Sequence, residues 1–135
     1  MPQMKPQLHV FAGCFASRED ACLYTEAQCE PEPDDKASKE DYASWEDRNP
    51  TWGLSADLGD IYLDSDAIET IDGDLRYEYL EAYLVNKGDL LKVKSAAPDA
   101  NILLLLFPDE LGGRNAHLYS TDRMVYCGAF EFRDP

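Results

Sequence analysis

The sequence predicts one α+β domain over residues 1–135, with a mostly antiparallel sheet of about four strands and helices packed on one face. Three observations support this class. The chain has the length of a single domain that buries one sizeable core. Its strand-like apolar segments lie towards the two ends with helical patterns between them, an order typical of antiparallel sheets packed with helices. The first and last strands also share nearly the same apolar sequence.

These two strands are predicted at residues 8–15 and 124–132. "HVFAGCF" in the first corresponds to "MVYCGAF" in the last, with Gly13 and Gly128 at equivalent positions. Both segments are rich in valine and aromatic residues, as buried strands are. A glycine within a strand permits a bulge or the close approach of a packed helix. We therefore expect the two strands to lie near each other at the middle of the sheet.

Capping residues and apolar periodicity predict the helices. Ser17, with Asp20 three residues later, predicts the start of a helix that runs to about Gln28. Further helical segments are predicted near residues 38–45 (a single turn), 66–71, 75–87 and 90–97.

The predicted helix 75–87 has Leu80 and Leu84 beside its main apolar face. That face consists of Leu75, Tyr79, Ala82 and Tyr83. Asp74 is its candidate N-cap, and Gly88 has the position of a C-terminal glycine. Asp89 is the candidate cap of the following helix, which Pro98 ends.

The remaining strands lie in the last third of the chain. "NILLLLF", residues 101–107, is short and uninterrupted, which indicates a central strand covered on both faces. Residues 117–120 and 124–132 are predicted to form a hairpin, and Gly112 and Gly113 fit a preceding turn.

Charge is the least ordinary property of the chain, whose 27 acids and 12 bases give a formal net charge of −15. Residues 19–81 contain 20 acids and 4 bases, whereas the rest is nearly neutral. Such a field repels nucleic acid and anionic membranes and attracts basic partners. The alternative interpretation is a solvated, partly flexible acidic face.

The acidic segment 31–53 is predicted to be a long irregular excursion. Carboxylates around aromatic anchors suit a basic protein surface, because the rings supply buried area and the carboxylates steer encounter. Trp45 and Trp52 are the candidate anchors, and their rings are expected to be more exposed than buried. The candidate rim is Asp34, Asp35, Glu40 and Asp41.

The four cysteines show no Cys-x-x-Cys spacing, and no secretory signal or membrane-spanning run is evident. We expect reduced thiols buried as small hydrophobes in a cytoplasmic protein that does not bind membranes.

The sequence makes no positive case for catalysis. "DSD", with Asp64 and Asp66, is similar to the aspartyl-nucleophile loop of haloacid-dehalogenase-type phosphotransferases, but Ala67 and Ile68 replace its usual following residues. The spacing of a calcium loop is also absent. A looser divalent-cation site among Asp57, Asp60, Asp64 and Asp66 stays open as an alternative. We predict a protein that is not an enzyme and has no cofactor and no metal.

Four separated blocks of the chain resemble, in order, the bacterial polymorphic-toxin immunity protein 22 family. The blocks are "HVFAGCF", "SADLGDIYLDSDAIE", "ANILLLLF" and "MVYCGAFEF". The resemblance implies architectural roles for Gly13, Phe15, Gly59, Gly128 and Phe130. It also marks Asp57, Asp64, Asp66 and Glu69, either as helix caps or as toxin-facing acids.

The function implied by the resemblance is a non-enzymatic immunity protein that binds and neutralises a cognate toxin domain. A basic nuclease domain is the expected partner, because an acidic inhibitor can occlude or mimic its phosphate path. Direct contact with nucleic acid is not expected. Two alternatives stay open: an acidic nucleic-acid mimic that inhibits a DNA-binding protein, and a small metal-dependent phosphotransferase using Asp64 and Asp66.

Overall fold

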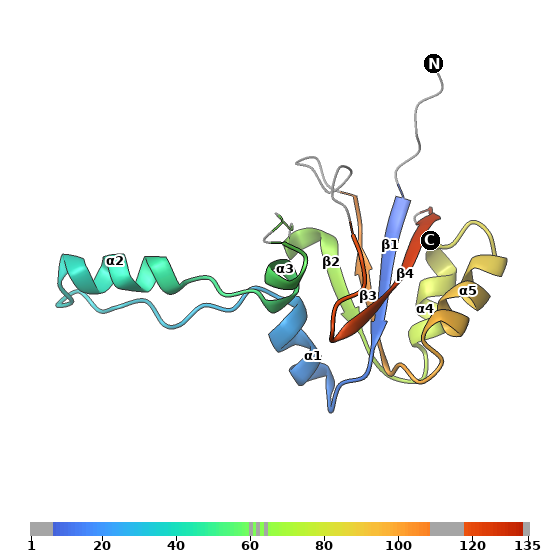
Figure 1. Cartoon of the computed structure of the whole chain (residues 1–135), viewed down its shortest axis with the longest axis horizontal. Helices are drawn as coiled ribbons and strands as arrows, with labels where there is room; N and C mark the ends of the chain where they lie inside the picture. The colour runs from blue at the N-terminus through green and yellow to red at the C-terminus, as the bar shows by residue number, and fades with distance from the viewer. Residues whose placement is uncertain (1–6, 60, 62, 64, 109–117, 134–135) are drawn as a thin grey trace, which may run out of the picture.

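A four-stranded antiparallel sheet forms the centre of the protein (Figure 1). The computed structural model describes residues 7–59, 61, 63, 65–108 and 118–133. The strands are β1 (Gln7–Gly13), β2 (Ile68–Ile71), β3 (Ile102–Leu106) and β4 (Met124–Glu131), in the order β2–β3–β1–β4. The helices are α1 (Arg18–Thr25), α2 (Lys39–Arg48), α3 (Gly53–Asp57), α4 (Arg76–Tyr83) and α5 (Gly88–Ala96), with a 3-10 turn η1 (Ser65–Ala67). The predicted α+β class is confirmed.

Helices cover both faces of this sheet, so the prediction of helices on one face is wrong. Leu103 and Leu105 of β3 pack with residues of α4 and α5. Leu104, from the same strand, points the other way and packs with residues of α1 and α3. The physical reason is the sequence of β3 itself: all five of its residues are buried, and alternate side chains of a strand point to opposite faces. Both faces therefore need a covering layer.

The first and last strands pair directly, as their similar sequences predicted. β1 and β4 are antiparallel, and their register shifts between Val10 and Phe11, opposite Gly128. This irregularity is the predicted glycine bulge, and Gly128 has a φ of +126°. A Cβ at Gly13 would lie 2.8 Å from the carbonyl oxygen of Arg123, so that glycine permits a close backbone approach. Both strands were expected at the middle of the sheet. Of the two, β1 is central, whereas β4 forms an edge.

The other residues marked as architectural are also part of the body. Phe15 and Phe130 are buried, and they belong to the cores on opposite faces of the sheet. Phe15 is held further by Asn101, whose side chain accepts from its N–H at 3.0 Å and donates to its carbonyl at 2.7 Å. Gly59 follows α3 with a φ of +85°.

β2 replaces the helix predicted at residues 66–71. Ile68–Ile71 pairs with Leu103–Leu106 of β3, and only η1 before it is helical. Thr70 is buried and shares a hydrogen bond of 2.8 Å with Thr25 of α1. The four-residue segment is too short for periodicity to distinguish a strand from a helix, and pairing with β3 decides its structure.

The helix predicted at residues 75–87 is shorter than expected, and a different face of it packs on the sheet. α4 ends at Tyr83. The buried residues that face the sheet are Leu80 within α4 and Leu84 directly after it, whereas Leu75 and Tyr79 are exposed. Leu75 occupies the N-cap position in place of Asp74.

Gly88 begins α5 and does not end α4, while Asp89 lies in the first turn of α5 and pairs with Lys92 at 3.2 Å. One further prediction needs correction. The described residues 118–120 form no strand, and the rest of that predicted hairpin arm, with Gly112 and Gly113, lies outside the described residues. No helix in the described part of the chain is long and apolar enough to cross a bilayer.

The bulge at Gly128 gives a testable prediction about stability. Gly128→Ala places a side chain at a φ of +126°, which costs about 1–3 kcal/mol of unfolding free energy. Gly88→Ala is the matched control, because a Cβ added at Gly88 would meet nothing within 4 Å and the φ there is ordinary. Urea unfolding followed by circular dichroism should show a lower midpoint for Gly128→Ala and an equal or slightly higher midpoint for Gly88→Ala, because alanine is favoured over glycine at an ordinary helical φ. Equal midpoints would mean that the bulge is not constrained.

Candidate functional site

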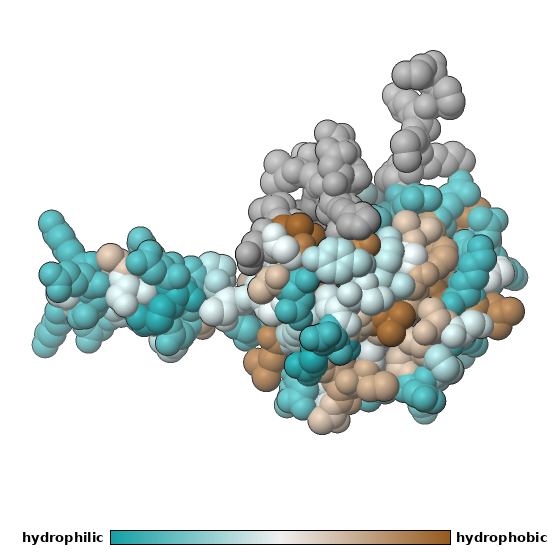
Figure 2. Space-filling model, viewed as in Figure 1, coloured by the Kyte–Doolittle hydropathy of each residue, from teal (hydrophilic) through white to brown (hydrophobic). Residues whose placement is uncertain are grey.

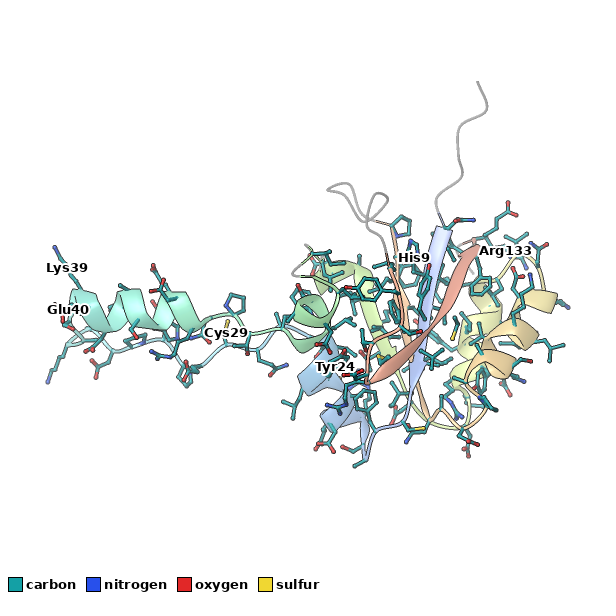
Figure 3. All side chains as sticks on the ribbon, viewed as in Figure 1. His9, Tyr24, Cys29, Lys39, Glu40 and Arg133 are labelled. Atoms are coloured by element: carbon teal, nitrogen blue, oxygen red, sulfur yellow. The ribbon has the colours of Figure 1, made fainter. Side chains whose placement is uncertain are left out.

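A long acidic projection extends away from the sheet (Figure 1). We call residues 28–51 the acidic arm; its base is a backbone pair between Gln28 and Thr51, with two N–H···O bonds of 2.7 Å. The arm consists of an extended segment that leads outward and helix α2, which returns. Its surface is mostly hydrophilic in Figure 2, and Lys39 and Glu40 lie at its tip (Figure 3). The predicted irregular excursion with a single helical turn is therefore an extended segment followed by the 10-residue helix α2.

Glu30 is the central residue that holds the arm together. Its carboxylate Oε2 accepts from Arg48 Nε at 2.9 Å and from Asn49 Nδ2 at 3.1 Å. These two bonds lower the pKa of Glu30 below its ordinary value. Its N–H donates to Asn49 Oδ1 at 2.7 Å, and its carbonyl accepts from Trp45 Nε1 at 2.9 Å. One residue of the outward segment thus connects to three residues on the returning side.

Two of the predicted rim acids also have structural roles in the arm. Ser38 and Asp41 form a capping box at the start of α2: Ser38 Oγ accepts from the Asp41 N–H at 3.0 Å, and Asp41 Oδ2 accepts from the Ser38 N–H at 3.3 Å. Asp34 Oδ1 accepts from the Lys36 N–H at 2.9 Å. The other two rim acids, Asp35 and Glu40, are exposed.

The arm carries much of the charge of the protein but adds no residue of α2 to its buried core. Residues 30–48 contain eight acids and three bases. Helix α2 has no buried residue. An element that buries nothing and concentrates charge has no evident use in stabilising the body, so its surface is the first candidate for contact with a partner.

The two tryptophans are less exposed than predicted. Trp45 and Trp52 are both half-buried. Trp45 packs within the arm through its bond to Glu30, while Trp52 packs against the core beside α1 and donates from Nε1 to Thr25 O at 2.8 Å. Both rings therefore stabilise the fold, Trp52 especially, and neither is a fully available anchor.

Asp57, which is itself exposed, belongs to a polar network at the surface of the body. Tyr24 OH lies 2.6 Å from Asp57 Oδ2 and 2.7 Å from Thr121 Oγ1, and the Tyr119 hydroxyl donates to the Asp57 carbonyl. Burial and the bond to Asp57 raise the pKa of Tyr24 to about 12. Arg123 stacks over the Tyr24 ring at 5.3 Å. The network joins α1, α3 and the turn before β4, which is a structural role for Asp57.

Of the other marked acids, the structure describes Asp66 and Glu69, which lie on neighbouring elements. Asp64, like Asp60, lies outside the described residues. Asp66 is in η1, and Glu69 on β2 accepts a bond from Tyr79 OH at 2.5 Å. Among the described residues, no group of three or more His, Cys, Asp or Glu side chains is placed to hold a metal ion. His9 has a structural role: its Nδ1 is 2.8 Å from Tyr126 OH, and burial lowers its pKa.

Comparison with known proteins adds no relative: no family model, no curated protein and no solved structure matches the chain.

A run of aromatic rings lies on the face of the sheet that α4 and α5 cover, opposite the face of α1 and α3. It was not predicted as a candidate site. We call Leu75, Tyr79, Tyr83, Phe107 and Phe132 the aromatic strip. The rings of Tyr79, Tyr83, Phe107 and Phe132 contact one another in that order. The sequence signal was present, because Leu75, Tyr79 and Tyr83 share one helical face, but that face was interpreted as core.

The cysteines also differ from prediction. Cys14 and Cys29 are exposed, and all four thiols of the chain are free. Cys127 is half-buried, and burial raises its pKa to about 11. The prediction of uniformly buried thiols is wrong, because Cys14 follows the end of β1 and Cys29 lies on the arm (Figure 3).

The capping box predicts a local effect of mutation in the arm. Asp41→Ala removes one of its two bonds and costs about 1 kcal/mol of α2 stability. Because α2 buries no residue, the melting temperature of the body should not change. Hydrogen exchange should show about fivefold lower protection of α2 amides, with Asp47→Ala as the exposed control. A large fall in the melting temperature would show that the arm supports the body.

Thiol exposure predicts the order of chemical labelling. At pH 8, Cys14 and Cys29 should react with Ellman's reagent first, since they are exposed. Cys127 should react at least about tenfold more slowly, because little of it is thiolate. Replacement of Cys14 and Cys29 by serine should remove the fast phase, and a fast phase that persists in this double variant would contradict the assignment.

Proposed function

We propose that this chain is a non-enzymatic immunity protein that binds and neutralises a cognate toxin domain, with the acidic arm as a principal contact. The observation that carries the proposal is the arm itself. It is held in shape by its own hydrogen bonds, carries a net charge of −5 over residues 30–48 and buries no side chain of α2. The resemblance of the four sequence blocks to immunity proteins supplies the class of partner.

A basic nuclease domain fits this surface best. Nuclease surfaces that hold nucleic acid carry positive charge, and a protruding acidic element can enter such a groove and exclude the substrate. Charges at the exposed rim of an interface act mainly on the rate of encounter, while each exposed pair contributes only about 0–1 kcal/mol. The arm is therefore expected to speed association more than it slows dissociation.

The structural roles of Asp34 and Asp41 change which acids are best removed in a test. A suitable arm variant neutralises exposed carboxylates without the capping box: Asp35→Asn, Glu40→Gln, Glu46→Gln and Asp47→Asn. A control variant makes the same change in net charge on the body: Glu19→Gln, Glu26→Gln, Asp99→Asn and Asp122→Asn.

The experiment measures association with a catalytically inactive form of the toxin domain encoded beside this gene. With surface plasmon resonance at several salt concentrations, the arm variant should associate about tenfold more slowly at low salt, with a weaker salt dependence. Its dissociation rate should change less, and the body variant should associate nearly as fast as wild type. Circular dichroism checks folding.

Three outcomes would contradict the proposal. Absence of binding to the toxin domain would remove the immunity function. Equal slowing in both variants would show that overall charge, and not the arm, steers association. Metal-dependent phosphatase or nuclease turnover that disappears in Asp64→Asn would favour the phosphotransferase alternative.

A further inference from the structure

The aromatic strip is a chain of contacting rings along α4 and the adjoining strand ends, with Leu75 one helical turn before Tyr79. Its ring centroids are 5.5 Å apart for Tyr79 and Tyr83, 5.2 Å for Tyr83 and Phe107, and 5.8 Å for Phe107 and Phe132. The inner rings pack against the buried core of α4 and α5. The strip therefore has a rigid, core-supported inner end and an open outer end.

The outer end of the strip is unusually exposed for its residue types. Leu75 is 66% exposed and Tyr79 is 40% exposed. The two stand one helical turn apart, and the core contacts of α4 are made instead by Leu80 and Leu84. The apolar face of Leu75 and Tyr79 is thus not required to hold the helix on the sheet. Tyrosine is enriched among interface anchors, because its ring is apolar and its hydroxyl is polar, and Leu75 adds exposed apolar area beside Tyr79.

The chain segment at the outer end of the strip is acidic, whereas Arg133 lies beside the inner end, next to Phe132 and with its N–H bonded to the Tyr83 carbonyl. Residues 68–85 contain five acids and one base. That base, Arg76, is engaged on other groups: it donates to the carbonyls of Gly73 and Ala100 and lies over the Tyr77 ring. Glu69 lies beside the exposed ring, because it accepts the bond from Tyr79 OH at 2.5 Å. An aromatic ring next to a carboxylate suits an arginine, whose guanidinium can stack on the ring and pair with the carboxylate.

We propose that the aromatic strip is a second docking surface, which binds an arginine-bearing apolar segment of a basic protein. The strip lies with α4 on one face of the sheet, whereas the arm is joined to α1 and α3 on the other (Figure 1). The two surfaces are therefore separate, and the strip does not depend on the function proposed for the arm. A second copy of this chain fits poorly, because it brings the same net charge of −4 over residues 68–85 against itself.

The test uses a fluorescent 12-residue peptide of alternating arginine and leucine as the probe, with a glutamate–leucine peptide as its control. All measurements are made in the background of the arm variant described above, so that the arm does not contribute to attraction. Binding is measured by fluorescence anisotropy, and the contact surface is mapped by amide chemical shifts. Sedimentation velocity of the protein alone reports self-association.

Four variants separate the ring, the carboxylate and general apolar exposure. Tyr79→Ser removes the ring, and Tyr79→Phe keeps it. Glu69→Gln removes the charge while its amide oxygen can still accept from Tyr79 OH. Leu23→Ser is the matched control, because Leu23 is 61% exposed on α1, which packs on the other face of the sheet.

The expected result is binding of the arginine–leucine peptide with shift changes centred on Leu75, Tyr79 and Tyr83. Tyr79→Ser should weaken binding about tenfold, and Glu69→Gln should weaken it about threefold with a smaller salt dependence. Tyr79→Phe and Leu23→Ser should bind like the arm variant alone.

Three results would overturn the proposal. The first is equal binding of the acidic and basic peptides. The second is a peptide that changes amide chemical shifts at residues outside the strip. This outcome does not require the Tyr79→Ser variant, so it can be read even if that variant is unstable. The third is self-association that Tyr79→Ser abolishes, which would identify a second copy as the occupant. Retained toxin binding by the arm in any of these cases leaves the proposed function standing.

Discussion

The double-sided burial of β3 is the constraint on which the rest of the fold depends. Its five residues, Ile102–Leu106, are all buried, and each large apolar side chain contributes about 1.5–3 kcal/mol when removed from water. Neither layer of helices can be omitted without exposing one row of these side chains. The helices that cover them are short, and isolated helices of such length are marginal in water. The helices are stabilised by packing on the sheet, and they in turn keep water from the apolar side chains of its two faces.

Much of this architecture could be predicted from the sequence, where apolar runs were long and bounded. The positions of β1, β3 and β4 followed from such runs, as did the proximity of the terminal strands. The two glycines were predicted to permit a bulge or a close approach, and the structure has the bulge at Gly128 and a close approach at Gly13. The failures have common physical causes. β2 is too short to show a period, and α4 carries two apolar rows. Periodicity alone does not say which row meets the sheet, because that choice is made by the neighbours of Leu80 and Leu84.

The candidate site was predictable in its charge and not in its geometry. Composition located the acids in the segment 31–53, but it did not distinguish carboxylates that hold the arm, such as Glu30 and Asp41, from those that only face solvent. Burial of Trp52 against the body and exposure of Tyr79 were likewise beyond the sequence. Both depend on contacts between residues far apart in the chain, Thr25 with Trp52 and Glu69 with Tyr79.

The construction of the arm has a consequence for how this protein can diverge. Because α2 buries no residue and the arm joins the body through the paired Gln28 and Thr51, substitutions along its outer surface escape the selection that preserves the core. Only a few positions, chiefly Glu30, Ser38 and Asp41, must be kept for the hairpin to retain its shape. Lineages can therefore exchange the surface of the arm rapidly while inheriting one scaffold. If the proposed immunity function holds, this separation lets the arm follow changes in the toxin while the body keeps its structure.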